Sequence, residues 1–176
     1  LLDIIKNFIC FSNEGIGSFK ILAGYHQYFA VRKAVESTRK ATITDGKGGV
    51  FWHTQGSGKT ALSYYLANIL SDFYSSNNQV AKFYFIVDRL DLLEQAAQEF
   101  EARGLVVKTA NSRTELMEQF RTVQAQEGNS GQQEITVVNI QRFAEDKQRV
   151  DLPSYATNLQ RIFIIDEAHR SYKPEG

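Results

Sequence analysis

Apolar residues recur along the chain in two patterns, and these patterns predict the order of helices and strands. Apolar residues three or four positions apart predict helices at residues 1–10, 25–40, 61–70, 89–100 and 113–123. Short, nearly unbroken apolar runs predict strands at residues 49–53, 82–87, 105–107, 134–140 and 161–166. Segments rich in glycine and polar residues, 11–20 and 124–133, are predicted to be loops.

Two groups of polar residues indicate where helices begin. Asp88 is placed to cap helix 89–100, with Asp91 at the third helical position. Ser112 and Glu115 have the S-x-x-E spacing of a capping box for helix 113–123. Because strands alternate with helices, we expect an α/β fold in which helices cover both faces of a parallel sheet.

The segment QGSGKT, residues 55–60, has the features of a phosphate-binding loop. Such a loop presents backbone N–H groups at a helix N-terminus and adds a cation. Gly56 and Gly58 permit the required backbone, Lys59 can reach the β- and γ-phosphates, and the Thr60 hydroxyl can bind Mg²⁺. His53 stands where the usual G-x-x-x-x-G-K-[ST] pattern has its first glycine, which marks only the entrance to the loop.

Two other interpretations of this loop stay open on the residues alone. It could be an ordinary glycine-rich turn with a solvent-facing lysine. GSGKTA also fits the G-x-G-x-x-A pattern of a dinucleotide-binding fold, in which Asp88 would bind the ribose. That second interpretation leaves Lys59 and Thr60 without a role.

A second motif follows about a hundred residues later. The apolar run at 161–165 ends in Asp166 and Glu167, and the carboxyl ends of buried strands form the ligand edge of an α/β sheet. Asp166 can hold Mg²⁺, and Glu167 can orient or deprotonate an attacking water. The alternative is a strand end with a capping aspartate.

Composition places limits on the class of protein. The chain has 176 residues, 43% hydrophobic and 23% charged, which is typical of a globular domain, and its net charge of zero neither favours nor excludes nucleic acid. Cys10 is the only cysteine, so an intrachain disulfide is impossible and a reducing, cytoplasmic location is expected. No apolar run approaches the roughly 18 residues of a membrane span, and the first residues lack the pattern of a signal peptide. Because the chain starts at leucine, we expect it to be a fragment.

The motifs resemble a known family. HTQGSGKT and DEAH resemble motifs I and II of superfamily 2 helicases and translocases. Together with KILAGYHQYFAVRKAVE, FWHTQGSGKT, FIVDRLDLLEQ, TVVNIQRF and IIDEAHRSY, they resemble the motor (R) subunit of type I restriction enzymes over nearly the whole chain from about Lys20. In that family His-Thr-Gln is the normal entry to the loop.

The resemblance implies a fold and an ATP site. It implies the first RecA-like domain of a P-loop NTPase, a three-layer α/β/α fold over residues 21–176 that stops after motif II. Residues 1–20 would then be a helical connector from an upstream nuclease domain. The implied ATP ligands, with Mg²⁺ as cofactor, are Thr54, Gln55, Gly56, Ser57, Gly58, Lys59 and Thr60. Gln27 would match the glutamine that recognises adenine, unless it is only a polar residue on a surface helix.

The resemblance also implies contacts with DNA. Arg89 and Gln141 match motifs that touch the DNA backbone, and such contacts position a protein without specifying sequence. Arg89 could equally be a solvated first-turn residue. His169 would couple the ATP site to the DNA side; His26 and His53 are not at the spacing that would make it a metal ligand.

The implied function is the ATP-binding half of a double-stranded DNA translocase within a type I restriction endonuclease, beside methyltransferase and specificity subunits. Two alternatives remain: another superfamily 2 motor, such as a DEAH-type helicase or a chromatin-remodelling type ATPase, or a nucleotide-binding scaffold that docks partner subunits. YHQYFAV and WHTQ favour the type I restriction translocase over another superfamily 2 motor.

We predict that the isolated chain binds ATP weakly or not at all and hydrolyses it negligibly. In the family a second RecA-like domain supplies the arginine that stabilises transition-state charge, a contribution of several orders of magnitude in rate. ATP turnover of the purified chain, measured with and without duplex DNA, tests this. Robust DNA-stimulated turnover would contradict it.

Overall fold

The computed structural model describes residues 1–13, 17–54, 56–110, 112–121, 133–141 and 159–168. Helices and strands alternate through most of the chain, as the apolar patterns predict. The helices are α1 (Leu2–Asn7), α2 (Tyr25–Ala41), α3 (Lys59–Ser76), α4 (Leu90–Ala102) and α5 (Arg113–Arg121). The strands are β1 (Ile9–Ser12), β2 (Phe19–Leu22), β3 (Val80–Val87), β4 (Val106–Ala110), β5 (Glu134–Asn139) and β6 (Leu159–Ile165).

Four of the strands form the central sheet, in the order β4-β5-β3-β6. Every neighbouring pair is parallel: Phe83 lies opposite Ile135 on β5, and Tyr84 lies opposite Phe163 on β6. The expected α/β fold with a parallel sheet is therefore confirmed. All four strands end at the same edge of the sheet, where the connections to the following helices begin.

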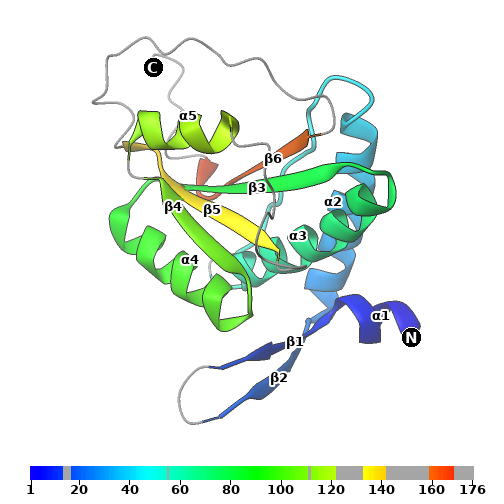
Figure 1. Ribbon diagram of the computed structural model, residues 1–176. Coiled ribbons are helices and arrows are strands. Elements are labelled where there is room, and N and C mark those ends of the chain that lie inside the picture. Colours follow the sequence, from blue (N-terminus) through cyan, green and yellow to red (C-terminus); the bar gives the residue numbers. More distant parts are fainter. Residues whose placement is uncertain (14–16, 55, 111, 122–132, 142–158, 169–176) are drawn as a thin grey trace.

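Helices cover both faces of this sheet, as Figure 1 shows, with α5 on one side and α2, α3 and α4 on the other. Side chains of β3 alternate between the two sides. Phe83 and Phe85 join the main core, where Phe85 meets Phe100 of α4 edge to face at 5.2 Å between ring centroids. Tyr84 points the other way and meets Phe120 of α5 at 4.9 Å.

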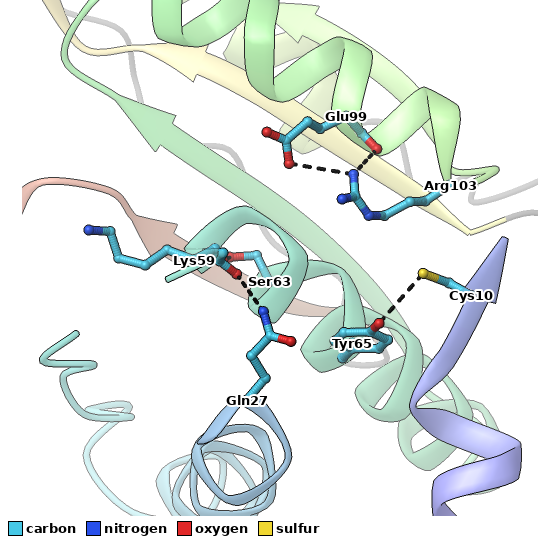
Figure 2. A network of polar contacts seen from close by, with 8 residues as sticks. Cys10, Gln27, Lys59, Ser63, Tyr65, Glu99 and Arg103 are labelled. Carbon is cyan, nitrogen blue, oxygen red and sulfur yellow. Dashed lines mark hydrogen bonds and ion pairs between the residues drawn. The ribbon is translucent and has the colours of Figure 1, made fainter. Parts of the chain in front are cut away.

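The N-terminal segment differs from the prediction of a helix over 1–10 and a loop over 11–20. The helix ends at Asn7, and β1 and β2 form an antiparallel hairpin that projects from the body of the domain (Figure 1). Phe8 and Cys10 are buried in the main core beside Tyr65 of α3: the Phe8 and Tyr65 rings lie 5.7 Å apart, and Cys10 Sγ is 3.5 Å from the Tyr65 hydroxyl (Figure 2). Residues two positions apart lie on nearly opposite sides of a helix, so the burial of both Phe8 and Cys10 in one core fits the strand that starts at Ile9 and not a continued helix.

The expected strand at 49–53 is also absent. This segment pairs with no strand in the described part of the chain, and Val50 and Trp52 are 87% and 92% exposed. Its apolar residues were therefore a misleading signal for a buried strand.

Helix starts were predicted with mixed success. Glu115 N–H donates to Ser112 Oγ at 3.2 Å, which confirms the cap of α5. The capping role of Asp88 is wrong, because Arg89 is extended and serves as the N-cap residue of α4, without a side-chain capping bond. The helix begins one residue later than expected, which moves Asp88 out of the capping position. The predicted loop at 124–133 lies outside the described residues except for Gln133.

None of the helices in the described ranges is long and apolar enough to cross a membrane. All five instead pack on the sheet or on one another.

Replacing Phe100 with alanine tests the packing of α4 on the sheet. Phe100 is fully buried, so the loss of its side chain should lower the free energy of unfolding by about 3–5 kcal/mol. Phe29 on α2, 59% exposed, is the matched control, and Phe29→Ala should cost less than about 1 kcal/mol. Urea unfolding of the two variants measures the difference, and equal costs would contradict this packing.

Candidate functional site

The phosphate-loop segment occupies the turn that leads into α3. Gly56 and Gly58 both have left-handed backbone, with φ of 76° and 75°, a conformation that side chains with a Cβ resist. Gly58 is the N-cap residue of α3, and Lys59 and Thr60 are its first two residues. The predicted placement of the loop at a helix N-terminus is therefore confirmed. Gln55 lies outside the described residues.

The acidic motif faces this loop. Asp166 follows the last residue of β6, and Glu167 Oε1 lies 3.7 Å from Lys59 Nζ. Glu167 has a φ of 49°, an uncommon conformation for a residue with a side chain, and its N–H donates to Asp166 Oδ1 at 3.0 Å. Two motifs about a hundred residues apart in sequence thus meet at one edge of the sheet.

Asp166 lies in an environment that disfavours its negative charge. Burial raises the pKa of Asp166, and the negative charges of Glu167 and Asp88 act in the same direction. The Glu167 N–H and the Lys59 ammonium oppose these effects. A carboxylate that is poorly stabilised by its surroundings gains strongly from a nearby cation.

Gln27 contacts the loop rather than an open pocket. Figure 2 shows it extending from α2 towards the start of α3, close to Lys59. Its Nε2 donates to the carbonyl oxygens of Ser57 and Gly58, each at 3.3 Å, and its Oε1 accepts from Gly24 N–H at 2.9 Å. A Cβ at Gly58 would lie 2.5 Å from Gln27 Nε2, so this contact itself requires glycine. Both ends of the Gln27 amide are engaged.

An open pocket of about 380 Å³ borders the loop. Its lining residues are His26, Trp52, His53, Thr54 and Ser57. The His26 and His53 rings are 5.9 Å apart, and His26 Nε2 is 3.3 Å from the Ser57 carbonyl oxygen. Within the described ranges, no three His, Cys, Asp or Glu residues gather as a metal site.

The two predicted DNA-contacting residues lie at the same sheet edge, on the connections after β3 and β5. Arg89 is exposed and forms a two-pronged ion pair with Asp91, at 3.1 and 2.7 Å. Gln141 is exposed, and its N–H donates to Asn139 Oδ1 at 2.9 Å. Within the described ranges, neither side chain bonds to the loop or to the acids. His169 lies outside the described residues.

Sequence reasoning did not single out Asn139, which ends β5 as Asp166 follows β6. Asn139 is fully buried, and its Nδ2 has no hydrogen-bond partner in the described part of the chain. The signal was present: a polar residue ends the apolar run TVVN, as an aspartate ends FIVD and FIID.

The arrangement has the chemistry of a nucleoside triphosphate site. Left-handed glycines, a helix N-terminus and Lys59 suit a phosphate chain, and the carboxylates opposite suit a metal ion and a water. The fold and the site therefore define the chain as a P-loop nucleotide-binding domain.

Comparison with known proteins gives the family. The model of the SWI2/SNF2 ATPase family matches residues 26–175, so the chain belongs to that family. It is 35% identical to the type I restriction enzyme HindI endonuclease subunit of Haemophilus influenzae, over 97% of this chain and 16% of that protein. A Staphylococcus aureus type I restriction enzyme endonuclease subunit is 37% identical over 78% of this chain and 14% of its own length.

A putative type I restriction enzyme endonuclease subunit of Methanocaldococcus jannaschii is 33% identical over 97% of this chain and 18% of its own length. The predicted resemblance to type I restriction enzyme subunits is confirmed by these relatives. The chain spans less than a fifth of the length of each.

Two substitutions at Gln27 distinguish its hydrogen bond to Gly24 from its hydrogen bonds to the loop carbonyls. Gln27→Glu keeps an acceptor for Gly24 N–H but loses the donor to the loop carbonyls, whereas Gln27→Ala loses both. Amide hydrogen exchange should accelerate at residues 56–60 in both variants, and at Gly24 only in Gln27→Ala. Loss of about 1 kcal/mol of local stability per bond corresponds to roughly fivefold faster exchange. Unchanged exchange at the loop in both variants would show that Gln27 does not hold it.

Proposed function

We propose that this chain is the ATP-binding half of an ATP-dependent double-stranded DNA translocase, within a subunit of a type I restriction endonuclease. The observation that carries the proposal is the convergence of the Gly58–Lys59 loop and the Asp166–Glu167 strand end, 3.7 Å apart at Lys59 and Glu167. Membership of the SWI2/SNF2 ATPase family supports ATP as the nucleotide.

In this proposal the loop binds the triphosphate of ATP. The N–H groups at the start of α3 and the Lys59 ammonium neutralise the β- and γ-phosphates. The γ-phosphate would compete with Glu167 for Lys59, which leaves the Glu167 carboxylate to orient or deprotonate the attacking water. Gln27 acts as a positioning residue for the loop, and adenine recognition by Gln27 would require it to release the Ser57 and Gly58 carbonyls.

The donor set fits Mg²⁺. This ion is usually bound through one or two carboxylates together with substrate phosphates and waters, rather than by a cage of protein ligands. Asp166 and the Thr60 hydroxyl are the residues that would hold it. When bound, it would neutralise charge on the phosphates of ATP. Burial is the largest cause of the raised pKa of Asp166, and a bound cation would offset this effect.

Duplex DNA is the proposed substrate of the motor, and Arg89, Gln141 and His169 are the proposed DNA-contacting and coupling residues. The names of the relatives, which are endonuclease subunits of type I restriction enzymes, support this assignment. We further propose methyltransferase and specificity subunits as partners in the complex, in the cytoplasm. In this view DNA is moved by ATP-driven closure against a second motor domain before it is cleaved.

Replacing Lys59 with alanine in the full-length protein tests the site. The variant should lower kcat for ATP hydrolysis by roughly 100-fold or more, because it removes a charge aimed at the developing negative charge. DNA translocation, followed by displacement of a triplex-forming strand, should fall with it.

Lys47→Ala is the matched control. Lys47 is an exposed lysine whose Nζ lies 3.6 Å from Asp45 Oδ2, so its loss should leave both rates within about twofold. If ATP turnover and translocation survive Lys59→Ala, the loop does not drive the motor, and the chain is better described as a nucleotide-binding scaffold.

A further inference from the structure

Three neighbouring strands end side by side at the ligand edge of the sheet. In the order β5-β3-β6, they deliver Asn139, Asp88 and Asp166. Val87 and Asn139 are register partners, and the pairing continues past the strand ends: Ile140 N–H donates to the Val87 carbonyl and Asp166 N–H to the Ile86 carbonyl, each at 2.9 Å. Asp88, which follows Val87, therefore lies on the strand between the other two.

Asn139 and Asp88 carry buried polar atoms without hydrogen-bond partners among the residues that the structure describes. Asn139 is 0% exposed, and its Oδ1 accepts from Gln141 N–H, but its Nδ2 donates to none of the described residues. Asp88 Oδ1 is buried and accepts no hydrogen bond from them. Buried groups without partners are rare in native proteins and need an explanation. A free donor and a free acceptor on adjacent strand ends are chemically complementary.

These two residues stand between the two proposed functional regions. On one side, each precedes an exposed residue of the proposed DNA-contacting set: Asp88 is followed by Arg89, and Asn139 holds the backbone of Gln141. On the other side, Asp88 continues β3, and Asp166 follows β6, which pairs with β3 up to its end, where Asp166 N–H donates to the Ile86 carbonyl at 2.9 Å. The pair therefore lies next to the connections on the DNA side and next to the strand end that carries Asp166.

We infer that Asp88 and Asn139 are positioning residues that couple DNA contact to ATP hydrolysis, by forming a donor–acceptor pair when DNA engages the connections after β3 and β5. This inference rests on the proposed function. Contact of DNA with Arg89 and Gln141 moves the two connections, and Asn139 Nδ2 then donates to Asp88 Oδ1, directly or through one water. That bond fixes Asp88 relative to Asp166 and so favours the hydrolytic arrangement of the acids.

The test uses the full-length subunit in its complete complex, with a long unmethylated linear duplex as the DNA. Asn139→Asp keeps the acceptor for Gln141 N–H but places two carboxylates together, so it removes the bond while preserving shape. It should lower the ratio of DNA-stimulated to basal ATP turnover roughly tenfold, while the KM for ATP stays within twofold. Asp88→Ala, which removes the acceptor, should lower the same ratio.

The exchanged pair Asp88→Asn with Asn139→Asp restores one donor and one acceptor, so it should recover most of the DNA stimulation. A merely structural role predicts neither this recovery nor a fall in the ratio of DNA-stimulated to basal ATP turnover. The inference is overturned if both single variants keep full stimulation, if basal and stimulated rates fall together, or if the exchanged pair is no better than Asn139→Asp. If Asn139→Asp does not fold, Asp88→Ala and the exchanged pair decide by the same criteria.

The Lys59→Ala variant separates this inference from the proposed function. If basal and DNA-stimulated turnover do not depend on Lys59, the proposed function fails. If turnover depends on Lys59 while the variants of Asp88 and Asn139 keep full DNA stimulation, only the coupling role fails.

Discussion

The packing of α3 against the sheet is the interaction on which the rest of the structure depends. Leu62, Tyr65, Leu66, Leu70 and Tyr74 line its buried side, and together they bring one helix into contact with β3, α2 and the base of the hairpin. Because α3 is held along its whole length, the direction of its N-terminus is fixed, and that end carries the phosphate loop. The carboxyl end of β6 is fixed by pairing with β3, so the loop and the acids face one another, with Lys59 Nζ 3.7 Å from Glu167 Oε1.

The sequence predicted the parts of the fold that depend on local periodicity. Helices α2 to α5 and strands β3 to β6 follow the apolar patterns because each buries one stripe or run against the same core. The hairpin was missed because its pattern mixes buried and exposed positions: Phe11 and Phe19 are exposed, while Cys10 and Ser12 are buried. The strand at 49–53 was predicted from apolar residues alone, but strand formation also needs a neighbouring backbone, which periodicity does not reveal.

The same limit applies to the site. The loop and the acid pair could be predicted because the chemistry of each depends on residues that are consecutive in the sequence. The double contact of Gln27 with Ser57 and Gly58 could not, because it joins residues about thirty positions apart through backbone carbonyls. The importance of Asn139 could not be predicted for a related reason. It comes from the register with Val87 and from a buried Nδ2 without a hydrogen-bond partner among the described residues, and the sequence reveals neither.

On the face of the sheet that α5 covers, two cationic side chains bond this helix to the strands. Lys82 and Arg161 are register partners on β3 and β6, and they donate to the carbonyl oxygens of Gln119 and Phe120 in the last turn of α5. Cations at a helix C-terminus satisfy carbonyls that lack partners within the helix. Burial lowers the pKa of Lys82, because keeping its ammonium charged in the core costs free energy. The hydrogen bond to the Gln119 carbonyl offsets part of that cost. Helix α5 is thereby bonded to β6, whose end carries Asp166 of the proposed ATP site, and to β3, whose end carries Asp88.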